Sequence, residues 1–577
     1  MGVEIRTLWD LVVRNLQRPD RPKALGIFQE GEPKWVNSHE IFIRSTSLAK
    51  ALLHFLEKGE AVGLMGSPGP DWMAIDLAIQ GAGGVSVPLF PNTAPNILKT
   101  QINQAKIKRI FLLESISSEQ AIHLKSIEVF SPENLLLPDL PQRKPFPGGS
   151  LHLKDASDWA TQRATELQAN QRATIIFTSG STGEPKGAPL THNNLVFQIQ
   201  GATERFPMGS KDKAISFLPL AHVFERMVTY SYLAQEVGIL FVHHPKSIPK
   251  ALLAHQPTVM TAVPRLLEKV YRAIKTGVES KSGLPKDLAR WALQLALTHH
   301  IDQPKPLFAW YGADLLAYKK MRDAMGGHLR MLIVGGAPLT KSLARFFTNI
   351  GVPTYQGYGL TECSPVLAAN HPGRNRPGSV GVSFPGVHLR IAPLTGEVLA
   401  KGPGIFKAYL DGDKNCFDEQ NWFHTGDRGK LDDDGYLFIT GRIKDRVKTS
   451  NGKYVSPPSI ERELCQHPWL DQALVIAESR PYVTALLCPD TEQVPKEILQ
   501  TLRESPSPHL SPHQMKDVQN HIDAINSKLN PWERVQKVQW LSSPFTIESG
   551  ELTPTLKVRR HIVFEKHLDL IEALYNN

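Results

Sequence analysis

Apolar residues in the first two-thirds of the chain alternate between helical spacing and short continuous runs. HEIFIRSTSLAKALLHFLEKG (39–59) has helical spacing, and AVGLMG (61–66) is typical of a buried strand. The pair then repeats, with DWMAIDLAIQGAG (71–83) helical and VSVPLF (85–90) a strand. This alternation predicts βαβ units and mostly parallel sheets. By contrast, the polar, Pro-containing residues 117–171 predict a surface connection or an irregular subdomain.

The pattern changes after Gly378, where short apolar segments are joined by turns. In GKLDDDGYLFITG (429–441) the Asp-Gly pair predicts a β-hairpin. A compact unit follows from about Arg442, with PPSIERELCQHPWL as a helix and QALVIAES and YVTALLC as paired strands. SPHQMKDVQNHIDAINSKLN predicts a helix with Ser511 as its N-cap.

These elements predict an α/β fold with more than one domain, since 577 residues exceed a single small core. We expect a large N-terminal domain over residues 1–441, built of βαβ subdomains, and a smaller α+β C-terminal domain over residues 442–577.

Composition and charge restrict the partners and the cellular compartment of the protein without identifying them. The net charge of +9 fits an anionic substrate or a membrane surface, but many housekeeping proteins are equally basic. The four cysteines form no CxxC pair, which favours free thiols in a reducing compartment. The start lacks a secretory signal, and the most apolar window, residues 74–90, contains Asp76, Gln80 and Pro88. We expect a cytoplasmic protein without a nucleic-acid partner; peripheral contact with the inner face of a membrane stays open.

A loop rich in glycines and hydroxyls lies in TIIFTSGSTGEPKGAPLTHNNL (174–195). Residues 173–177 predict a buried strand before it, and Thr191 is a candidate N-cap for a helix after it. Glycines let backbone amides approach an anion, while the hydroxyls and Lys186 add donors and a positive charge. No GxxxxGK[ST] register fits, so a Walker loop is disfavoured. On these residues alone, a phosphate loop and a plain flexible loop are equally open.

Other segments carry further candidate chemistry. YQGYGLTECSP (355–365) combines an aromatic face at Tyr358 with the Glu362 carboxylate, which suits Mg²⁺ beside phosphates or is simply solvated on a strained turn. LIVGGAPL (332–339) allows close backbone approach to a flat ring. HTGD places Asp427 in a turn, where it holds ribose hydroxyls or caps the turn. Lys557 lies in the exposed, Thr/Pro-rich stretch ESGELTPTLKVRR, where a lone lysine is usually only surface.

Taken together, TSGSTGEPKG, YGLTE, HTGD, GRIKD and LTPTLK resemble the adenylate-forming superfamily of acyl-CoA synthetases, luciferases and peptide-synthetase adenylation domains. The resemblance runs from about Val62 to Arg560. SFLPLAHVFERM (216–227) and VPRLLEKVY (263–271) look like the long-chain fatty acyl-CoA ligase branch. The resemblance also implies a small β-barrel in the N-terminal domain and a mobile C-terminal domain.

The resemblance implies two half-reactions at one site. A fatty acid carboxylate attacks the α-phosphate of ATP and releases pyrophosphate, and a thiol then converts the acyl-adenylate to a thioester and AMP. Positioning and electrostatic stabilisation dominate such a step, because two anions must meet. ATP, Mg²⁺ and CoA are the implied cofactors and co-substrates. An acyl-[acyl-carrier-protein] synthetase, which transfers to a carrier phosphopantetheine, shares every motif.

Two rivals lie outside this chemistry. A phosphoryl-transfer enzyme is disfavoured by the missing Walker register. A non-catalytic lipid- or nucleotide-binding relative is expected to have lost Lys557, Glu362 or Asp427, and all three are present.

The same resemblance implies which residues bind each part of the substrates. The β- and γ-phosphates are expected to be bound by Thr178, Ser179, Gly180, Ser181, Thr182, Gly183 and Lys186. Mg²⁺ is expected to be bound by Glu362 with Thr178. The adenine pocket is expected to be formed by Gly336, Ala337, Pro338, Gln356, Gly357 and Tyr358, with Thr361 near the α-phosphate. Asp427 binds the ribose with Arg442 nearby, and His222 lies where the carboxylate meets the α-phosphate, or is an ordinary core histidine.

The C-terminal domain supplies the remaining roles. Lys557 carries the adenylation step as a mobile positive charge. Lys444 matches the hinge, and the loop with Lys448, Gly452 and Tyr454 serves the thioester step. Apolar stretches such as MVTYSYLAQEVGILFV line an acyl channel or simply form core, so chain length is not readable.

Overall fold

The computed structural model describes residues 5–576 except 18–19, 139, 148, 180–184, 505–509, 548 and 554–557. The chain forms two compact units. The first contains Met1–Ala392, Val398–Thr425 and Lys430–Phe438, and the second contains Pro393–Glu397, Gly426–Gly429 and Ile439–Asn577.

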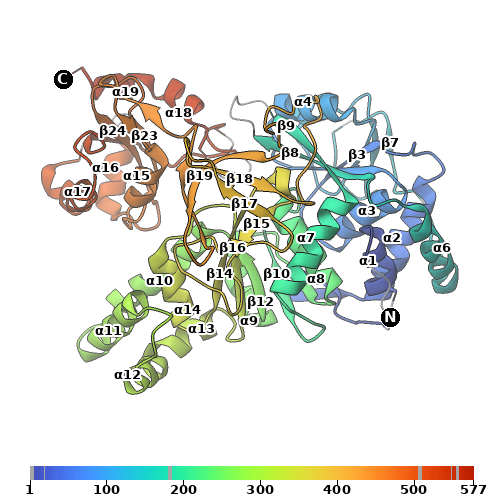
Figure 1. Cartoon of the computed structure of the whole chain (residues 1–577), viewed down its shortest axis with the longest axis horizontal. Helices are drawn as coiled ribbons and strands as arrows, with labels where there is room; N and C mark the ends of the chain where they lie inside the picture. The colour runs from blue at the N-terminus through green and yellow to red at the C-terminus, as the bar shows by residue number, and fades with distance from the viewer. Residues whose placement is uncertain are drawn as a thin grey trace. The chain divides into compact units, whose positions relative to one another are not determined.

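A seven-stranded sheet lies in the N-terminal part of the first unit (Figure 1). Its neighbouring strands run parallel except for the antiparallel pair β8 and β9. The strands, in their order across the sheet, are β7 (Arg143–Lys144), β6 (Glu128–Phe130), β5 (Arg109–Leu112), β3 (Ala61–Met65), β4 (Val85–Leu89), β8 (Arg172–Ser179) and β9 (Pro185–Thr191). Every residue of β3 and β4 is buried, which explains their unbroken apolar runs.

A nine-stranded sheet forms the other half of this unit. Its strands are β16 (Val382–Ser383), β15 (Val366–Ala369), β14 (Thr354–Gly359), β13 (Met331–Val334), β12 (Val259–Ala262), β10 (Lys213–Ser216), β11 (Gly238–Phe241), β1 (Leu25–Gln29) and β2 (Glu32–Val36). The strands from β14 to β1 run parallel, and β15 and β2 add antiparallel edges. The carboxyl ends of the parallel strands therefore meet at one edge, the usual place for a ligand in such sheets.

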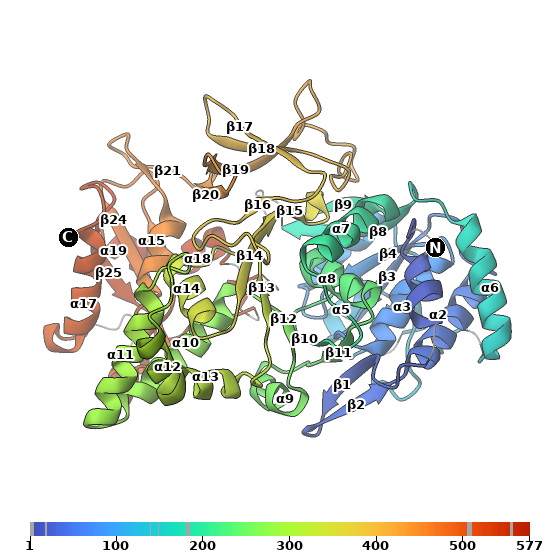
Figure 2. The ribbon, with the colours of Figure 1, turned by 60° about the horizontal axis from the view of Figure 1, so that its bottom comes forward.

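Helices cover both sheets, and α7 and α8 lie between them (Figure 2). The helices of this unit are α1 (Trp9–Leu11), η1 (Val12–Leu16), α2 (Ser38–Leu52), α3 (Pro70–Gly81), α4 (Pro95–Ala105), α5 (Ser118–Ile122), α6 (Leu153–Glu166), α7 (His192–Arg205), α8 (Val223–Ala234), η2 (Pro245–Ser247), α9 (Ile248–His255), α10 (Pro264–Glu279), α11 (Leu284–Thr298), α12 (Leu307–Ala313), η3 (Asp314–Tyr318), α13 (Lys319–Ala324), α14 (Lys341–Asn349) and η4 (Thr361–Cys363). The predicted helix–strand alternation of residues 39–90 is confirmed by α2, β3, α3 and β4. The prediction of an irregular region over residues 117–171 is wrong for α5, β6, β7 and α6, and right for the other described residues between β6 and α6.

A four-stranded sheet lies after Gly378, where the pattern of the sequence changes to short strands joined by turns. Its order is β17 (His388–Ile391), β18 (Glu397–Lys401), β19 (Phe423–Leu431) and β20 (Leu437–Arg442). The predicted Asp-Gly hairpin joins β19 to β20, and Gly435 takes the left-handed conformation with φ of 80°.

The second unit has an α+β core of its own. Its elements are β21 (Val447–Lys448), β22 (Tyr454–Val455), α15 (Pro457–Leu464), β23 (Leu470–Ile476), β24 (Val483–Pro489), α16 (Lys496–Arg503), α17 (Pro512–Asn526), β25 (Val535–Trp540), α18 (Arg560–Lys566) and α19 (Leu568–Ala573). The predicted pairing of β23 with β24 is confirmed, as is Ser511 as the N-cap of α17, where it forms a capping box with Gln514.

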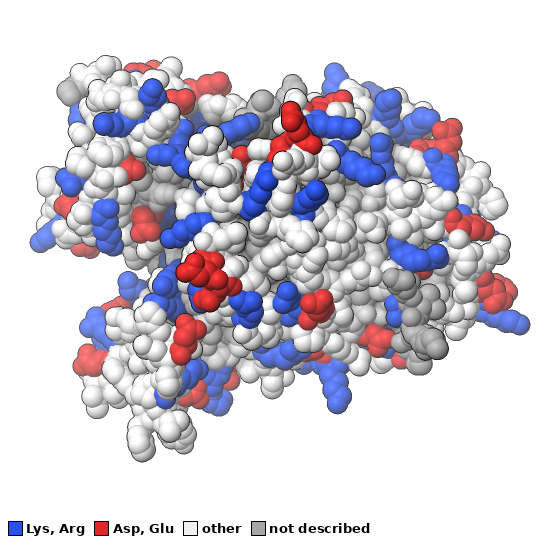
Figure 3. Space-filling model, in the orientation of Figure 1, with Lys and Arg blue, Asp and Glu red and all other residues white. Residues whose placement is uncertain are grey.

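Three further features bear on the predictions from composition. Acidic and basic side chains are interspersed on the face in Figure 3. None of the four cysteines forms a disulfide. Within the described ranges, no helix is both long and apolar enough to cross a bilayer.

Candidate functional site

The glycine- and hydroxyl-rich loop connects two antiparallel strands. Thr178 pairs with Lys186 across β8 and β9, and the Thr178 hydroxyl donates to the Lys186 carbonyl at 3.4 Å. The sequence did not predict β9, because PKGAPLT has two prolines and no apolar alternation. Thr191 caps α7 after this strand, as predicted. The predicted phosphate residues Gly180, Ser181, Thr182 and Gly183 lie outside the described residues, and Ser179 is placed here only by its backbone pairing with Pro185.

Lys186 is paired in this structure with a segment 227 residues away. Its Nζ lies 3.0 Å from Oδ2 of Asp413 and 5.1 Å from the ring centroid of Tyr409. The hydrogen bond to Asp413 raises the pKa of Lys186, so the side chain is charged at the base of the hairpin.

The Glu362 carboxylate is buried and accepts a hydrogen bond of 2.6 Å from the Tyr409 hydroxyl. Burial raises the pKa of Tyr409, and the negative charge of Glu362 adds to the effect, so the phenol keeps its proton and donates. Phe406 donates its backbone N–H to the Glu362 carbonyl at 2.8 Å.

Gln198 fixes the turn that carries Glu362. From α7, its Nε2 donates to the carbonyls of Cys363 and Val366, each at 2.9 Å. The helix that follows the hairpin thus holds the acidic turn. Gln198, Tyr409 and Asp413 were missed by the sequence reasoning; the run AYLDGD, with one tyrosine between apolar residues and a Gly turn, is the only hint in the sequence.

Two turns leave the nine-stranded sheet side by side. Val334 at the end of β13 pairs with Gln356 in β14, so both chains emerge at the same edge. Gly336, with φ of 81°, takes the left-handed conformation, and the predicted pocket residues Ala337 and Pro338 after it are exposed. Both turns follow the carboxyl ends of parallel strands, where sheets of this kind usually bind ligands.

The second of these turns begins later than predicted. Strand β14 continues through Gly357 and Tyr358 to Gly359, where the sequence favoured a turn. A Cβ at Gly359 would lie 1.7 Å from the Pro365 carbonyl oxygen, so glycine is required there. Thr361 and Glu362 follow in η4.

His222 is the N-cap of α8, and its Nδ1 accepts from the Phe224 amide at 3.3 Å. The ring of Phe224 lies against Gly335 at the end of β13, where an added Cβ would come within 2.9 Å of it. The first turn of α8 therefore adjoins the Gly336 turn. His222 is half-buried there, with its ring held by the cap of the helix.

A buried carboxyl group lies one turn further along α8. Glu225 accepts from the Ser216 hydroxyl at 2.6 Å and the Thr261 hydroxyl at 2.7 Å, which ties α8 to the ends of β10 and β12. Burial raises the pKa of Glu225 to about 7, against the two hydrogen bonds, which lower it.

Arg226, beside it, makes a fully buried ion pair that joins the two sheets. Its guanidinium binds the Asp76 carboxylate of α3 and donates to the Thr174 hydroxyl of β8 at 2.6 Å. The Tyr230 hydroxyl also binds Asp76, and the Ser86 hydroxyl donates to it at 2.6 Å. The strand that leads into the loop and the helix that carries His222 are thus fastened together.

In the second unit, Asp427 and Arg442 are paired. Asp427 is buried within β19, not in the turn that we predicted, because β19 runs on to Leu431. The Arg442 Nε lies 3.1 Å from Oδ1 of Asp427.

The predicted hinge and thioester-step residues follow Arg442. Lys444 is exposed between β20 and β21, and Lys448 ends β21. Gly452 has φ of 76° in the tight turn to β22, and Tyr454 is half-exposed with the Arg446 guanidinium 5.0 Å from its ring centroid.

Lys557 lies outside the described residues. The residues on either side, Leu552 and Val558, form an antiparallel bridge. Arg560 binds Oε1 of Glu461 at 2.5 Å and also the Val475 carbonyl, so the chain just after Lys557 is anchored on α15 and β23.

Comparison with protein families decides the membership of the chain. Residues 13–410 match the AMP-binding enzyme family, and residues 444–577 match the AMP-binding enzyme C-terminal domain. The chain belongs to the AMP-binding enzyme family. Among curated relatives of this AMP-binding enzyme, the long-chain-fatty-acid–CoA ligase FadD15 of Mycobacterium bovis is 31% identical over 537 residues, covering 90% of this chain and 89% of the relative. The long-chain-fatty-acid–CoA ligase 6 of Homo sapiens is 30% identical over 618 residues, covering 99% and 87%.

Solved structures agree on the fold of this AMP-binding enzyme. ATP-bound MatB from Rhodopseudomonas palustris has a TM-score of 0.67 at 22% identity, covering 97% of this chain and 99% of MatB. The adenylation domain of a carboxylate reductase from Mycobacterium chelonae has a TM-score of 0.73 at 19% identity, covering 99% and 91%.

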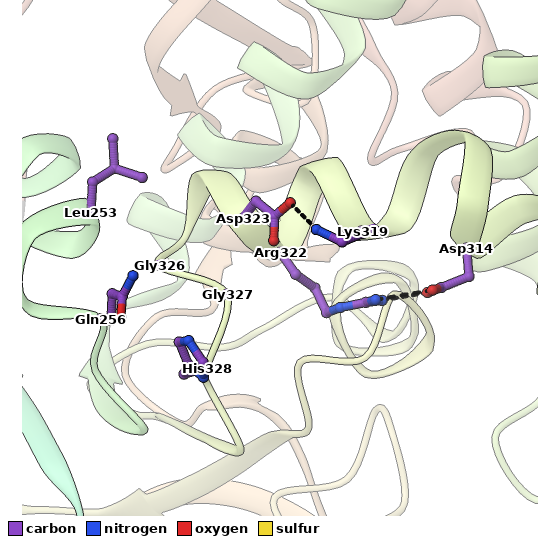
Figure 4. A pocket seen from close by; sticks show the side chains of 9 residues that line it. All are labelled: Leu253, Gln256, Asp314, Lys319, Arg322, Asp323, Gly326, Gly327 and His328. Carbon is purple, nitrogen blue, oxygen red and sulfur yellow. Dashed lines mark hydrogen bonds and ion pairs between the residues drawn. The ribbon is translucent and has the colours of Figure 1, made fainter.

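A surface pocket of about 650 Å³ lies elsewhere in this AMP-binding enzyme, beside α9, η3 and α13 (Figure 4). Its charged side chains are already paired, Arg322 with Asp314 at 2.5 Å and Lys319 with Asp323 at 2.8 Å. None of the predicted site residues lines it, so it is not a candidate for the ATP site.

Proposed function

We propose that this protein activates a long-chain fatty acid with ATP to the acyl-adenylate and transfers the acyl group to CoA, giving acyl-CoA, AMP and pyrophosphate. The observation that carries the proposal is the joining of Glu362 and Lys186 by residues 409–413, with Glu362 on the chain that leaves β14 beside the exposed turn after β13. A buried carboxylate can hold Mg²⁺ and a charged lysine can bind phosphate oxygens, as Mg²⁺-ATP requires.

In this proposal, Lys186 and the hairpin loop bind the β- and γ-phosphates. Glu362, with the Thr178 hydroxyl, holds Mg²⁺, which neutralises phosphate charge when bound. A single buried carboxylate fits, because Mg²⁺ is usually held by one or two carboxylates plus substrate phosphates. The adenine lies between the Gly336 turn and Tyr358.

The reacting groups meet beside α8. His222 faces the carboxylate and the α-phosphate, where its ring N–H can donate to developing negative charge. Lys557 brings a second positive charge to the same place. Asp427 accepts from the ribose hydroxyls, and Arg442 orients it through their ion pair.

We propose residues 442–577 as a mobile domain that turns about Lys444 between the half-reactions. The turn would withdraw Lys557 and bring the β21–β22 loop with Gly452 to the thiol. CoA is the acceptor that the curated relatives' names favour. A carrier-protein phosphopantetheine is the alternative, because the basic residues 444–453 would suit CoA phosphates or an acidic carrier.

ATP–pyrophosphate exchange with a panel of carboxylates tests this function. We expect exchange that depends on a long-chain fatty acid, followed by AMP and acyl-CoA when CoA is added. Holo-carrier protein replaces CoA in a parallel reaction. Faster acyl transfer to it than to CoA would indicate an acyl-[acyl-carrier-protein] synthetase. Glu362→Gln is the matched inactive control. Formation of ADP and phosphate would contradict the proposal.

A further inference from the structure

The helix formed by α12 and η3 turns its apolar side chains toward solvent. Leu307 is 82% exposed, Phe308 96%, Tyr311 74% and Leu315 65%. These positions are i, i+1, i+4 and i+8, so they form one stripe along the helix. Isolated exposed leucines are ordinary on a protein surface, but a stripe of four large apolar side chains marks an interaction surface.

This exposure is not a result of loose packing. On the opposite side, Ala313, Ala317 and Tyr318 are buried, and the Tyr318 hydroxyl donates to the Ala292 carbonyl of α11 at 2.8 Å. The Trp310 ring packs 5.8 Å from the ring of Tyr318. The helix is therefore fastened to α11 while its apolar stripe is held outward. Figures 1 and 2 show α11 and α12 projecting away from the nine-stranded sheet, and the tip of this lobe is largely white in Figure 3.

Basic residues flank the stripe. Residues 279–325 contain seven Lys or Arg against five Asp or Glu, and Glu279 pairs with Lys286 and Arg290. Asp314 and Asp323 are each neutralised by an ion pair, with Arg322 and Lys319. Lys305 lies just before the stripe in the sequence, with its Nζ 4.6 Å from the Trp310 ring centroid. Lys320 follows the stripe and is exposed.

We propose that the stripe Leu307, Phe308, Tyr311 and Leu315 docks on an anionic lipid surface. An apolar and aromatic stripe with lysines at its margins matches the interface of a bilayer, where the rings enter the headgroup region and the ammonium groups meet anionic lipids. A neighbouring copy of this chain fits less well, because two such surfaces would bring their lysines together. The proposed function gives the docking a use, since a long-chain fatty acid partitions into membranes, but the docking does not depend on ATP.

Flotation with lipid vesicles tests the docking. The full chain is mixed with phosphatidylcholine vesicles, with or without phosphatidylglycerol, and no ATP or fatty acid is added. We expect the wild type to float, more completely with phosphatidylglycerol and at low salt. The triple variant Leu307→Ser/Phe308→Ser/Tyr311→Ser should lose at least about tenfold in bound fraction.

Two controls make the result specific. Leu136→Ser and Leu394→Ser remove leucines that are 86% and 99% exposed elsewhere, and both should float as the wild type does. Lys305→Gln or Lys320→Gln should weaken binding to phosphatidylglycerol vesicles by about fivefold each and leave binding to phosphatidylcholine unchanged.

Three outcomes would overturn the proposal. The wild type fails to float with either vesicle, or the triple variant floats like the wild type. In the third, sedimentation equilibrium finds that the wild type is a dimer and the triple variant a monomer, while vesicle binding is unchanged, which assigns the stripe to self-association. A cooperative urea unfolding transition like that of the wild type serves as the folding control for each variant. Because the flotation uses no nucleotide, a failure to bind vesicles would not contradict the proposed function. A failure of the exchange reaction would likewise not contradict the docking.

Discussion

The Tyr409 phenol donates a hydrogen bond of 2.6 Å to the buried Glu362 carboxylate. Four residues further on, Asp413 pairs with Lys186. One short segment therefore contacts both groups proposed to hold the metal and the phosphates. Tyr409 acts as a positioning residue, because it orients the carboxylate and contributes no charge of its own.

Tyr409→Phe should lower fatty-acid-dependent ATP–pyrophosphate exchange by about tenfold to a hundredfold, since a hydrogen bond to a charged group contributes about 1.5–3 kcal/mol. The loss should be partly recovered at high Mg²⁺, which a merely structural defect would not show. Tyr311→Phe, at an exposed tyrosine, is the control. If Tyr409→Phe showed the same exchange rate as the wild type at every Mg²⁺ concentration, this role would be refuted.

Asp413→Asn should lower the KM for ATP by about twofold to fivefold. The substitution removes a negative charge beside the site proposed for the polyphosphate, and it frees Lys186 to bind the phosphates. Lys186→Met should instead raise the KM. Initial rates over a range of ATP concentrations give both values. If Asp413→Asn raised the KM, Asp413 would be an orienting partner of Lys186 and not a competitor of ATP.

Arg226→Met should lower the free energy of unfolding by about 3–5 kcal/mol, because it leaves the Asp76 carboxylate buried without its cation. Arg44, which pairs with Glu40 and Asp71 on the surface, offers the matched control. Arg44→Met should cost less than about 1 kcal/mol. Urea unfolding compares the two variants, and equal losses would show that the buried pair has no special weight.

Glu225 should make stability depend on pH. Its pKa in the folded protein is about 7, above the ordinary 4.5. The protonated carboxyl group therefore contributes its full share of the unfolding free energy below pH 4.5, and this contribution is lost as the pH rises through 7. Between pH 5 and 8, the wild type should lose about 2 kcal/mol more unfolding free energy than Glu225→Gln. Glu57→Gln, at an exposed position, should follow the wild type. Parallel curves for the wild type and Glu225→Gln would contradict the buried protonated carboxyl.

Local patterns predicted the local structure. The Asp-Gly hairpin between β19 and β20 and the capping box at Ser511 need only a few neighbouring residues, and both are present. Strand β9 was missed because its signal is its pairing with β8, and its own composition resembles a loop.

The contacts that join the site could not be predicted from patterns. Tyr409 and Glu362 are 47 residues apart, Arg226 and Asp76 are 150 apart, and Lys186 and Asp413 are 227 apart. Periodicity and turn chemistry describe neighbours along the chain, whereas these pairs are set by how the sheets and helices pack. The motifs indicated which residues carry the chemistry, and the fold adds the residues that orient them.

The central claim is that Lys557 performs adenylation while the phosphate hairpin only holds the leaving pyrophosphate. The most direct measurement follows the two half-reactions of Lys557→Ala separately. We expect ATP–pyrophosphate exchange with a long-chain fatty acid to fall by at least about a hundredfold, since the variant loses a charge that stabilises the transition state. Thioester formation from presynthesised acyl-adenylate and CoA should stay within about twofold of the wild type. An equal loss in both half-reactions, or full exchange activity in the variant, would contradict the account.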